Sequence, residues 1–147
     1  MPEKETLDRA REDAREGKSP STQAGEFVRE EIHHVREGKH GVRSPQQAIA
    51  IGLSKARRAG VKLAAPKSGS AALRKKTKED SAAGRKKSQT KVSPTRSRAV
   101  KSALKRESHT TASRAALSRQ AKKSSAQRSP QNRKKAAAKA VRTRKAA

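Results

Sequence analysis

The sequence has no cysteine, tryptophan or tyrosine, and Phe27 is its only aromatic residue. Without cysteine there is no disulfide framework and no thiol chemistry. No run approaches the ~18 apolar residues of a membrane span, and the start of the chain lacks the apolar stretch of a secretory signal, so we expect neither insertion nor export by that route. Only 30% of the residues are apolar, alanine included. A chain this poor in apolar surface is not expected to be a large globular enzyme.

Positive charge is what the chain has in excess. Its 147 residues include 39 Lys and Arg but only 13 Asp and Glu, a formal net charge of +26. Residues 1–38 carry −3, residues 39–65 carry +6 and residues 66–147 carry +23. The large aliphatic residues are concentrated before Pro66, and the Lys-Ser-Gly-Ser that follows it is typical of a linker. We therefore expect a head, residues 1–65, and a basic tail, residues 66–147.

The head is predicted to consist of three short helices. Apolar residues recur there at helical spacing, and a glycine follows each stretch at the position that favours a helix end. The expected helices span about residues 2–16, 20–37 and 45–59. Ser44, Pro45 and Gln47 have the residue types of an N-cap, a first helical position and a capping box. With Phe27 as its one aromatic residue the core is thin, so we expect the head to need a partner, self-association or the tail for stability.

A resemblance to a known family lies in segment 37–60, which reads EGKHGVRSPQQAIAIGLSKARRAG. This string resembles a bacterial family of uncharacterised proteins, domain of unknown function 6496. Residues 104–107 and 116–121 are more loosely similar to its longer members. The resemblance implies a bacterial or phage source and transfers no activity. The Ala-, Lys- and Arg-rich segment 133–145 is similar in composition to bacterial histone H1-like tails.

The tail is rich in small clusters of cations separated by Ala, Ser and Thr, which repel one another and offer little to pack. The predicted fold class is therefore mainly α: a small three-helix N-terminal head followed by a long basic tail that is disordered or forms isolated helices. Neutralisation by a polyanion should favour helix, since Ala, Lys and Arg are good helix formers. The helix-prone segments are about residues 95–106, 112–127 and 131–145.

The tail's cations predict binding to nucleic acid, with DNA favoured over RNA. The tail has no aromatic side chain to stack on bases, so we expect it to contact the phosphate backbone with little sequence preference. The candidate binding residues are Arg74, Lys75, Lys76, Arg85, Lys86, Lys87, Arg96, Arg98, Lys101, Lys105, Arg106, Arg114, Arg119, Lys122, Lys123, Arg133, Lys134, Lys135, Lys139, Arg142, Arg144 and Lys145. These features favour a non-catalytic protein of nucleoid-associated or histone H1-like type, located in the cytoplasm on the nucleoid.

Two other functions fit the same composition: an RNA- or ribosome-associated basic factor, and a protein-interaction adaptor with a polycationic arm. Self-association or a protein partner through the head is compatible with all three. No nucleophile–base pair or Gly-rich phosphate loop indicates catalysis, and no cofactor is expected. His33, His34 and His40 are the only metal-like group. Adjacent histidines on a helix point in different directions and no cysteine completes a site, so we expect surface or partly packed roles and no metal.

Overall fold

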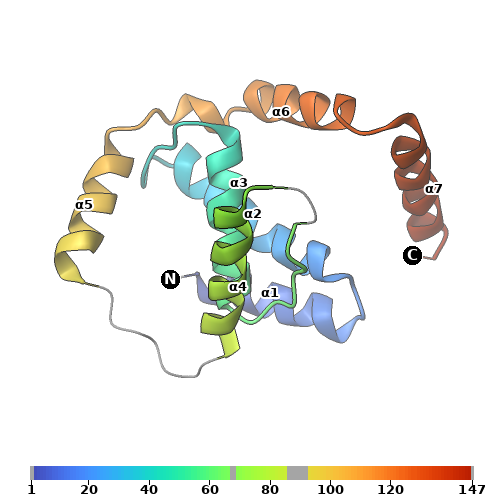
Figure 1. Ribbon diagram of the computed structural model, residues 1–147, viewed down its shortest axis with the longest axis horizontal. Helices are drawn as coiled ribbons and strands as arrows, with labels where there is room; N and C mark the ends of the chain where they lie inside the picture. The colour runs from blue at the N-terminus through green and yellow to red at the C-terminus, as the bar shows by residue number, and fades with distance from the viewer. Residues whose placement is uncertain (1, 67–68, 86–92, 147) are drawn as a thin grey trace. The chain divides into compact units, whose positions relative to one another are not determined.

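The computed structural model describes residues 2–66, 69–85 and 93–146, which form seven α-helices and one short 3-10 helix, η1 (Figure 1). The elements are α1 (Lys4–Arg15), α2 (Pro20–Arg36), α3 (Pro45–Arg58), α4 (Ala71–Arg85), α5 (Pro94–Lys105), η1 (Thr110–Ala112), α6 (Arg114–Ala126) and α7 (Pro130–Ala146). Tertiary contacts divide the chain into two compact units, residues 1–112 and residues 113–147. The first unit contains α1 to α5 and η1, and the second contains α6 and α7.

The ends of α3 follow the chemistry that the sequence predicts. The Ser44 hydroxyl accepts a hydrogen bond from the Gln47 backbone N–H at 3.3 Å, and the Gln47 side chain accepts one from the Arg43 backbone N–H at 2.9 Å. These bonds satisfy N–H groups that have no partner within the helix. Pro45 occupies the first turn, and Gly60 follows the helix with a φ of 96°. Local residue types therefore determine where α3 begins and ends.

The core of the first unit lies where α2 packs against both α1 and α3. One cluster is centred on Phe27, which is 1% exposed and packs with three alanines: Ala10, Ala24 and Ala56. A second cluster joins Val35, Val42, Ala48 and Ala112. Truncating a buried Phe to Ala costs about 3–5 kcal/mol, so Phe27 alone accounts for a large part of a small domain's stability.

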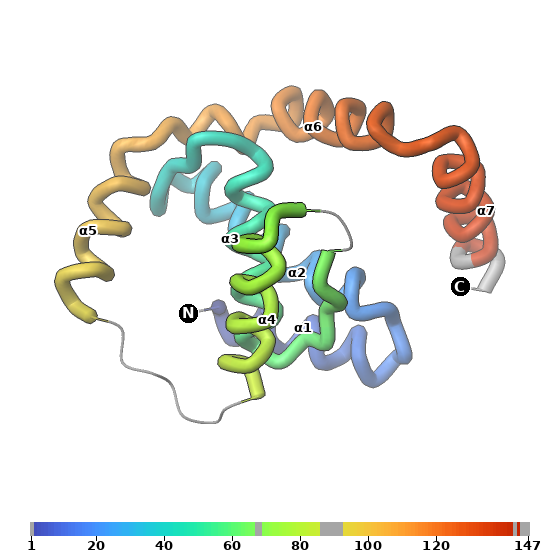
Figure 2. The backbone as a smooth tube through the Cα atoms, viewed as in Figure 1, coloured from blue at the N-terminus to red at the C-terminus, as the bar shows by residue number. Residues whose placement is uncertain are grey.

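The prediction of a short head followed by a tail that is disordered or forms isolated helices is wrong. Residues 71–85 and 94–146 are almost entirely helical, and parts of them pack on α2 and α3. α4 runs alongside α3 (Figure 2), and Ala112 of η1 is fully buried in the second core cluster. Composition predicted disorder because it counts apolar residues, whereas these contacts are made by buried polar groups, alanine and backbone hydrogen bonds.

α4 docks on α3 through Asp80, whose side chain is only 3% exposed. Its carboxylate accepts hydrogen bonds from the Ser54 hydroxyl at 2.7 Å and from Arg58 Nε at 2.9 Å, both on α3. Lys76, one turn earlier in α4, donates to the same carboxylate at 3.0 Å. One turn further along α4, a Cβ on Gly84 would collide with the Arg57 carbonyl oxygen. A buried carboxylate and a missing side chain thus bring α4 close to α3.

A second part of the predicted tail docks through its backbone. Gly41 N–H donates to the Leu104 carbonyl at 2.9 Å and Val42 N–H donates to the Ser108 carbonyl at 3.1 Å. The Thr111 hydroxyl donates to the Val42 carbonyl at 2.7 Å. The end of α5 and the residues up to η1 are therefore tied to the loop between α2 and α3.

The second unit begins each of its helices with a serine cap. The Ser113 hydroxyl accepts from the Ala116 N–H and the Ser129 hydroxyl accepts from the Asn132 N–H, both at 3.3 Å. Pro130 occupies the first position of α7, as the Ser-Pro pair predicts. Among the described residues, no helix is both long enough and apolar enough to span a membrane.

Candidate nucleic-acid interface

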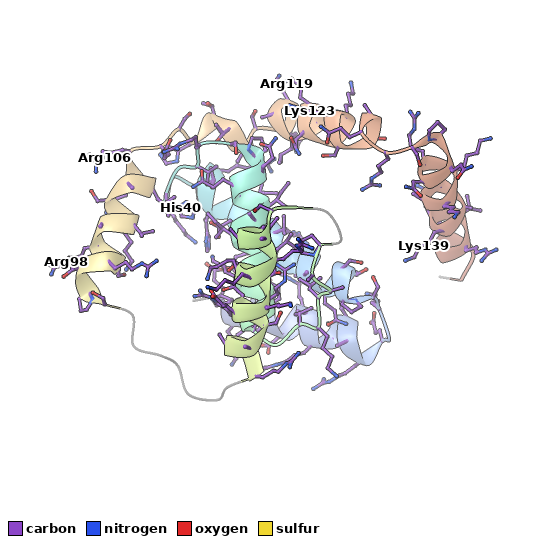
Figure 3. The ribbon with its side chains drawn as sticks, viewed as in Figure 1. His40, Arg98, Arg106, Arg119, Lys123 and Lys139 are labelled. Atoms are coloured by element: carbon purple, nitrogen blue, oxygen red, sulfur yellow. The ribbon has the colours of Figure 1, made fainter. Side chains whose placement is uncertain are left out.

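The segment that contains α6 and α7 has many basic residues and no acidic ones. Residues 113–147 contain twelve Lys and Arg and no Asp or Glu. Arg119, Lys122 and Lys123 are spaced i, i+3 and i+4, which places them on one face of α6, and all three are exposed. Figure 3 shows Arg119 and Lys123 projecting from this helix. This face, which we call the α6 basic face, presents three cations to solvent within about one helical turn.

α7 carries its cations on more than one face. Arg133, Lys134 and Lys135 are consecutive, and an α-helix turns by about 100° per residue, so they point in different directions. They are exposed, as are Lys139, Arg142 and Arg144 further along. A helix with cations around its circumference can contact phosphates from several sides, but it offers no single surface that would fit a groove.

α5 has a basic face like that of α6. Arg98, Lys101 and Lys105 follow at i, i+3 and i+7 and therefore share one face of the helix. All three are exposed, whereas Leu104 is half-buried. Arg106, just after the helix, is exposed and its Nε donates to the Ser102 carbonyl at 3.3 Å. The labelled side chains Arg98 and Arg106 can be followed in Figure 3.

α4 separates its cations into an inner and an outer set. Arg74, Lys75 and Lys78 are exposed, whereas Thr77 and Asp80 are buried. Lys76 is also exposed, but it is paired with Asp80 and supports the α3–α4 contact. Of the cations predicted to bind phosphate, Lys76 therefore has an intramolecular role. Lys78, one turn from Arg74, is a better candidate for the outer set.

The described candidate cations are all exposed, as phosphate contacts require. They are Arg74, Lys75, Lys76, Arg85, Arg96, Arg98, Lys101, Lys105, Arg106, Arg114, Arg119, Lys122, Lys123, Arg133, Lys134, Lys135, Lys139, Arg142 and Arg144. Lys86 and Lys87 lie outside the described residues, and so does the side chain of Lys145. Arg128 lies after α6 and is exposed, and its charge makes it an equally good candidate although it is not among the predicted residues.

A different cluster lies at the end of α2, where acids and histidines meet. His34 and Lys39 contact Glu3 Oε1 at 2.9 and 3.1 Å, and these hydrogen bonds lower the pKa of Glu3 to about 2. Donor atoms of Glu31, His34 and His40 lie within 4.8 Å of one another. His33 is exposed and outside this group, as expected for adjacent helical histidines. Spacing along the chain does not predict that Glu31 joins the histidines, because it is the path of the loop after α2 that brings His40 back to Glu31.

The fold and these sites define a small helical protein whose exposed surfaces carry an excess of cations. Residues 15–68, which include α2 and α3, match the model of a family of unknown function, DUF6496. This match confirms the resemblance inferred from segment 37–60. No curated protein and no solved structure matches the chain.

Proposed function

We propose that this protein is a non-catalytic, sequence-nonspecific nucleic-acid-binding protein that contacts the phosphate backbone of DNA, in the manner of nucleoid-associated or histone H1-like proteins. The observation that carries the proposal is the segment 113–147, where twelve cations occur without one acid. Those whose side chains are described are all exposed, and all but Arg128 lie on α6 or α7. Such a segment gains affinity by releasing the counterions condensed on the polyanion. Its cellular location would then be the cytoplasm, on the nucleoid.

Backbone contact is favoured over base reading by the chemistry of the exposed faces. Sequence readout in the major groove relies on bidentate contacts from a few side chains on one inserted helix face. The α6 basic face offers three charges, with alanines and serines around them, and α7 spreads its charges around the helix. Neither helix has an aromatic residue that could stack on an unpaired base.

The proposal is tested by fluorescence anisotropy with mixed-sequence duplex DNA over a salt series. A protein that neutralises about six to ten phosphates loses about 10³–10⁵ in affinity between about 50 and 200 mM salt. We expect a loss in this range and similar affinities for duplexes of unrelated sequence. Affinity that is insensitive to salt, or that depends strongly on sequence, would refute the proposal.

A charge-matched pair of variants identifies the surface. The α6 variant replaces three cations of the basic face by glutamine, and the control replaces three exposed cations of α1. The substitutions are Arg119→Gln, Lys122→Gln and Lys123→Gln against Lys4→Gln, Arg11→Gln and Arg15→Gln. The α6 variant should lower the slope of log affinity against log salt by about 2 to 3, since each phosphate contact contributes about 0.9. The α1 control should leave the slope nearly unchanged.

Competition separates DNA from RNA as the preferred ligand. Duplex DNA and a structured RNA are offered at equal phosphate concentration, and DNA should be retained preferentially. Preference for the RNA would instead support a ribosome-associated factor.

A chain ending at Ala112 tests the alternative of a protein-interaction adaptor. Nucleoid localisation should be lost without α6 and α7, whereas retained localisation would mean that the first unit recognises a protein.

A further inference from the structure

Three side chains with metal-binding chemistry converge where α2 ends and the next loop returns. Glu31 and His34 are three residues apart on one face of α2, and His40 comes from the loop before α3. Their donor atoms lie within 4.8 Å of one another. The Glu31 side chain is 1% exposed, and His34 and His40 are 13% and 18% exposed. Both histidines are thus held in place by the fold.

The His40 ring lies between two hydrogen-bond acceptors. Its Nδ1 is 3.1 Å from the Gly41 carbonyl oxygen, and its Nε2 is 3.1 Å from Glu31 Oε1. A carbonyl and a carboxylate only accept, and a neutral imidazole has one N–H. The ring can therefore donate to only one of the two oxygens, and its other nitrogen directs a lone pair at the second. When Nδ1 carries the proton, a cation between Nε2 and Glu31 Oε1 would relieve that repulsion.

The charges around the cluster favour binding of a cation. Glu30 and Glu31 are both buried, and Lys55 serves both, with Nζ 2.7 Å from Glu31 Oε2 and 3.4 Å from Glu30 Oε1. The contact with Glu31 is an ion pair without hydrogen-bond geometry. Lys39 is paired with Glu3 and Glu37. Within the described part of the chain, Lys55 is thus the one Lys or Arg paired with these two buried carboxylates. The other groups that face them are the Glu3 N–H, 3.2 Å from Glu30 Oε2, and the two histidines, with His34 Nδ1 3.9 Å from Glu30 Oε1 and His40 Nε2 3.1 Å from Glu31 Oε1.

We propose that Glu31, His34 and His40 bind one Zn²⁺ ion. Two imidazole nitrogens and one carboxylate oxygen are a common ligand set for zinc, and a water can take the fourth position. In a tetrahedral shell with bonds of about 2.0–2.2 Å, neighbouring ligand atoms lie about 3.3–3.6 Å apart. The Glu31–His40 separation of 3.1 Å is already close to that spacing. Binding requires the His34 donor, which lies within 4.8 Å of the other two, to move closer by side-chain rotation, and if that donor is Nε2 it gives up its 2.9 Å contact with Glu3 Oε1. Lys55 can keep its contact with Glu31 Oε2.

The ion would tie the loop between α2 and α3 to the end of α2. His40 carries one ligand, and its backbone carbonyl lies 3.1 Å from His109 Nδ1 in the segment before η1. The next residue, Gly41, donates to Leu104. Fixing His40 to α2 therefore fixes the backbone on which residues 104–112 dock. This role is independent of nucleic-acid binding.

The test uses the full chain without a histidine tag, titrated with Zn²⁺ in competition with a chelator of known affinity. We expect one equivalent to bind. His40→Ala should weaken binding by about 100-fold or more, since losing even an outer-sphere partner costs about 10–100-fold. His33→Ala is the matched control, because His33 neighbours His34 in sequence but is exposed and outside the cluster; its affinity should equal the wild type's.

A measurement on the wild-type protein guards against a variant that fails to fold. Ring ¹⁵N NMR signals of the four histidines are recorded with and without Zn²⁺. Selective shifts at His34 and His40, with His33 and His109 unchanged, support the site. The proposal is overturned by the absence of stoichiometric binding, by equal losses in His40→Ala and His33→Ala, or by a doubly protonated His40 that persists at saturating Zn²⁺.

Discussion

At the scale of single residues, Asp80 shows how one buried carboxylate fixes a helix. It accepts hydrogen bonds from two residues of α3 and one of α4. Arg58 and Lys76, which donate to it, are about half exposed, so water can solvate them if Asp80 is removed. The stability lost when Asp80 is replaced should therefore reflect the missing hydrogen bonds, because neither cation is left buried without a partner.

Asp80→Asn should lower the free energy of unfolding by about 1–3 kcal/mol, because three hydrogen bonds to a charged acceptor are weakened. Urea denaturation followed by circular dichroism at 222 nm measures the change. Glu79→Gln is the control, since Glu79 is the exposed neighbour and loses the same charge. Equal effects of the two substitutions would contradict the role assigned to Asp80.

The same carboxylate predicts a pH dependence. Burial raises the pKa of Asp80, but hydrogen bonds from Ser54, Lys76 and Arg58 outweigh it, so the pKa lies below the ordinary 3.8. As the pH falls, the unfolded chain is therefore protonated first, and the stability from Asp80 is lost below about pH 4. The difference in unfolding free energy between wild type and Asp80→Asn should shrink between about pH 6 and pH 3. A constant difference would contradict this.

At the scale of elements, the loop between α2 and α3 depends on the absence of a side chain at Gly41. A Cβ there would collide with the carbonyl oxygen of Glu107. The next residue, Val42, is fully buried, and its backbone N–H donates to the Ser108 carbonyl. Residues 104–112 can dock only while the two backbones approach this closely.

Gly41→Ala should release that segment and expose the Val42 amide. Hydrogen exchange at Val42 is expected to accelerate by at least about tenfold, which corresponds to about 1.4 kcal/mol of lost local stability. Gly25→Ala is the control: Gly25 lies within α2 with open space around its Cα, so alanine should stabilise the helix by about 0.5–1 kcal/mol. Unchanged exchange at Val42 in Gly41→Ala would refute the close-approach argument.

At the scale of the whole molecule, stability and charge are divided differently along the chain. The unit of residues 1–112 contains both hydrophobic clusters and carries a net charge of +14, from 27 cations and 13 acids. The unit of residues 113–147 carries +12 with no acid. The acids are therefore confined to the unit with the core, where many of them form ion pairs.

Two truncations test this division. A chain ending at Ala112 keeps both clusters, so its thermal midpoint should stay close to that of the full chain. A chain ending at Ala65 lacks α4 and Ala112, and its midpoint should fall by about 4–8 °C or more, the shift expected for about 1 kcal/mol in a domain of this size. Circular dichroism at 222 nm follows both. Equal midpoints for the two truncated chains would show that α4 and η1 contribute no stability.

The sequence by itself determined the features that depend on neighbours along the chain. Ser44, Pro45 and Gln47 define the start of α3, because capping is a local interaction. The uneven charge is likewise a property of sequence alone, and it identified the cations of α5, α6 and α7 as the candidate surface. The composition of the tail underestimates its helix content, because repulsion between cations favours disorder whereas Ala, Lys and Arg have high helix propensity.

Only the tertiary structure decided which distant residues meet. Asp80 in a basic segment, Ala112 among small polar residues, and His40 in a glycine-containing loop carry no local signal of their partners. Each acquires its role from a backbone approach or a buried polar contact: Asp80 with Arg58, Ala112 with Val42, and His40 with Glu31. Composition and periodicity report how much apolar surface a segment can bury, but they do not report which polar groups will satisfy one another once the chain has folded.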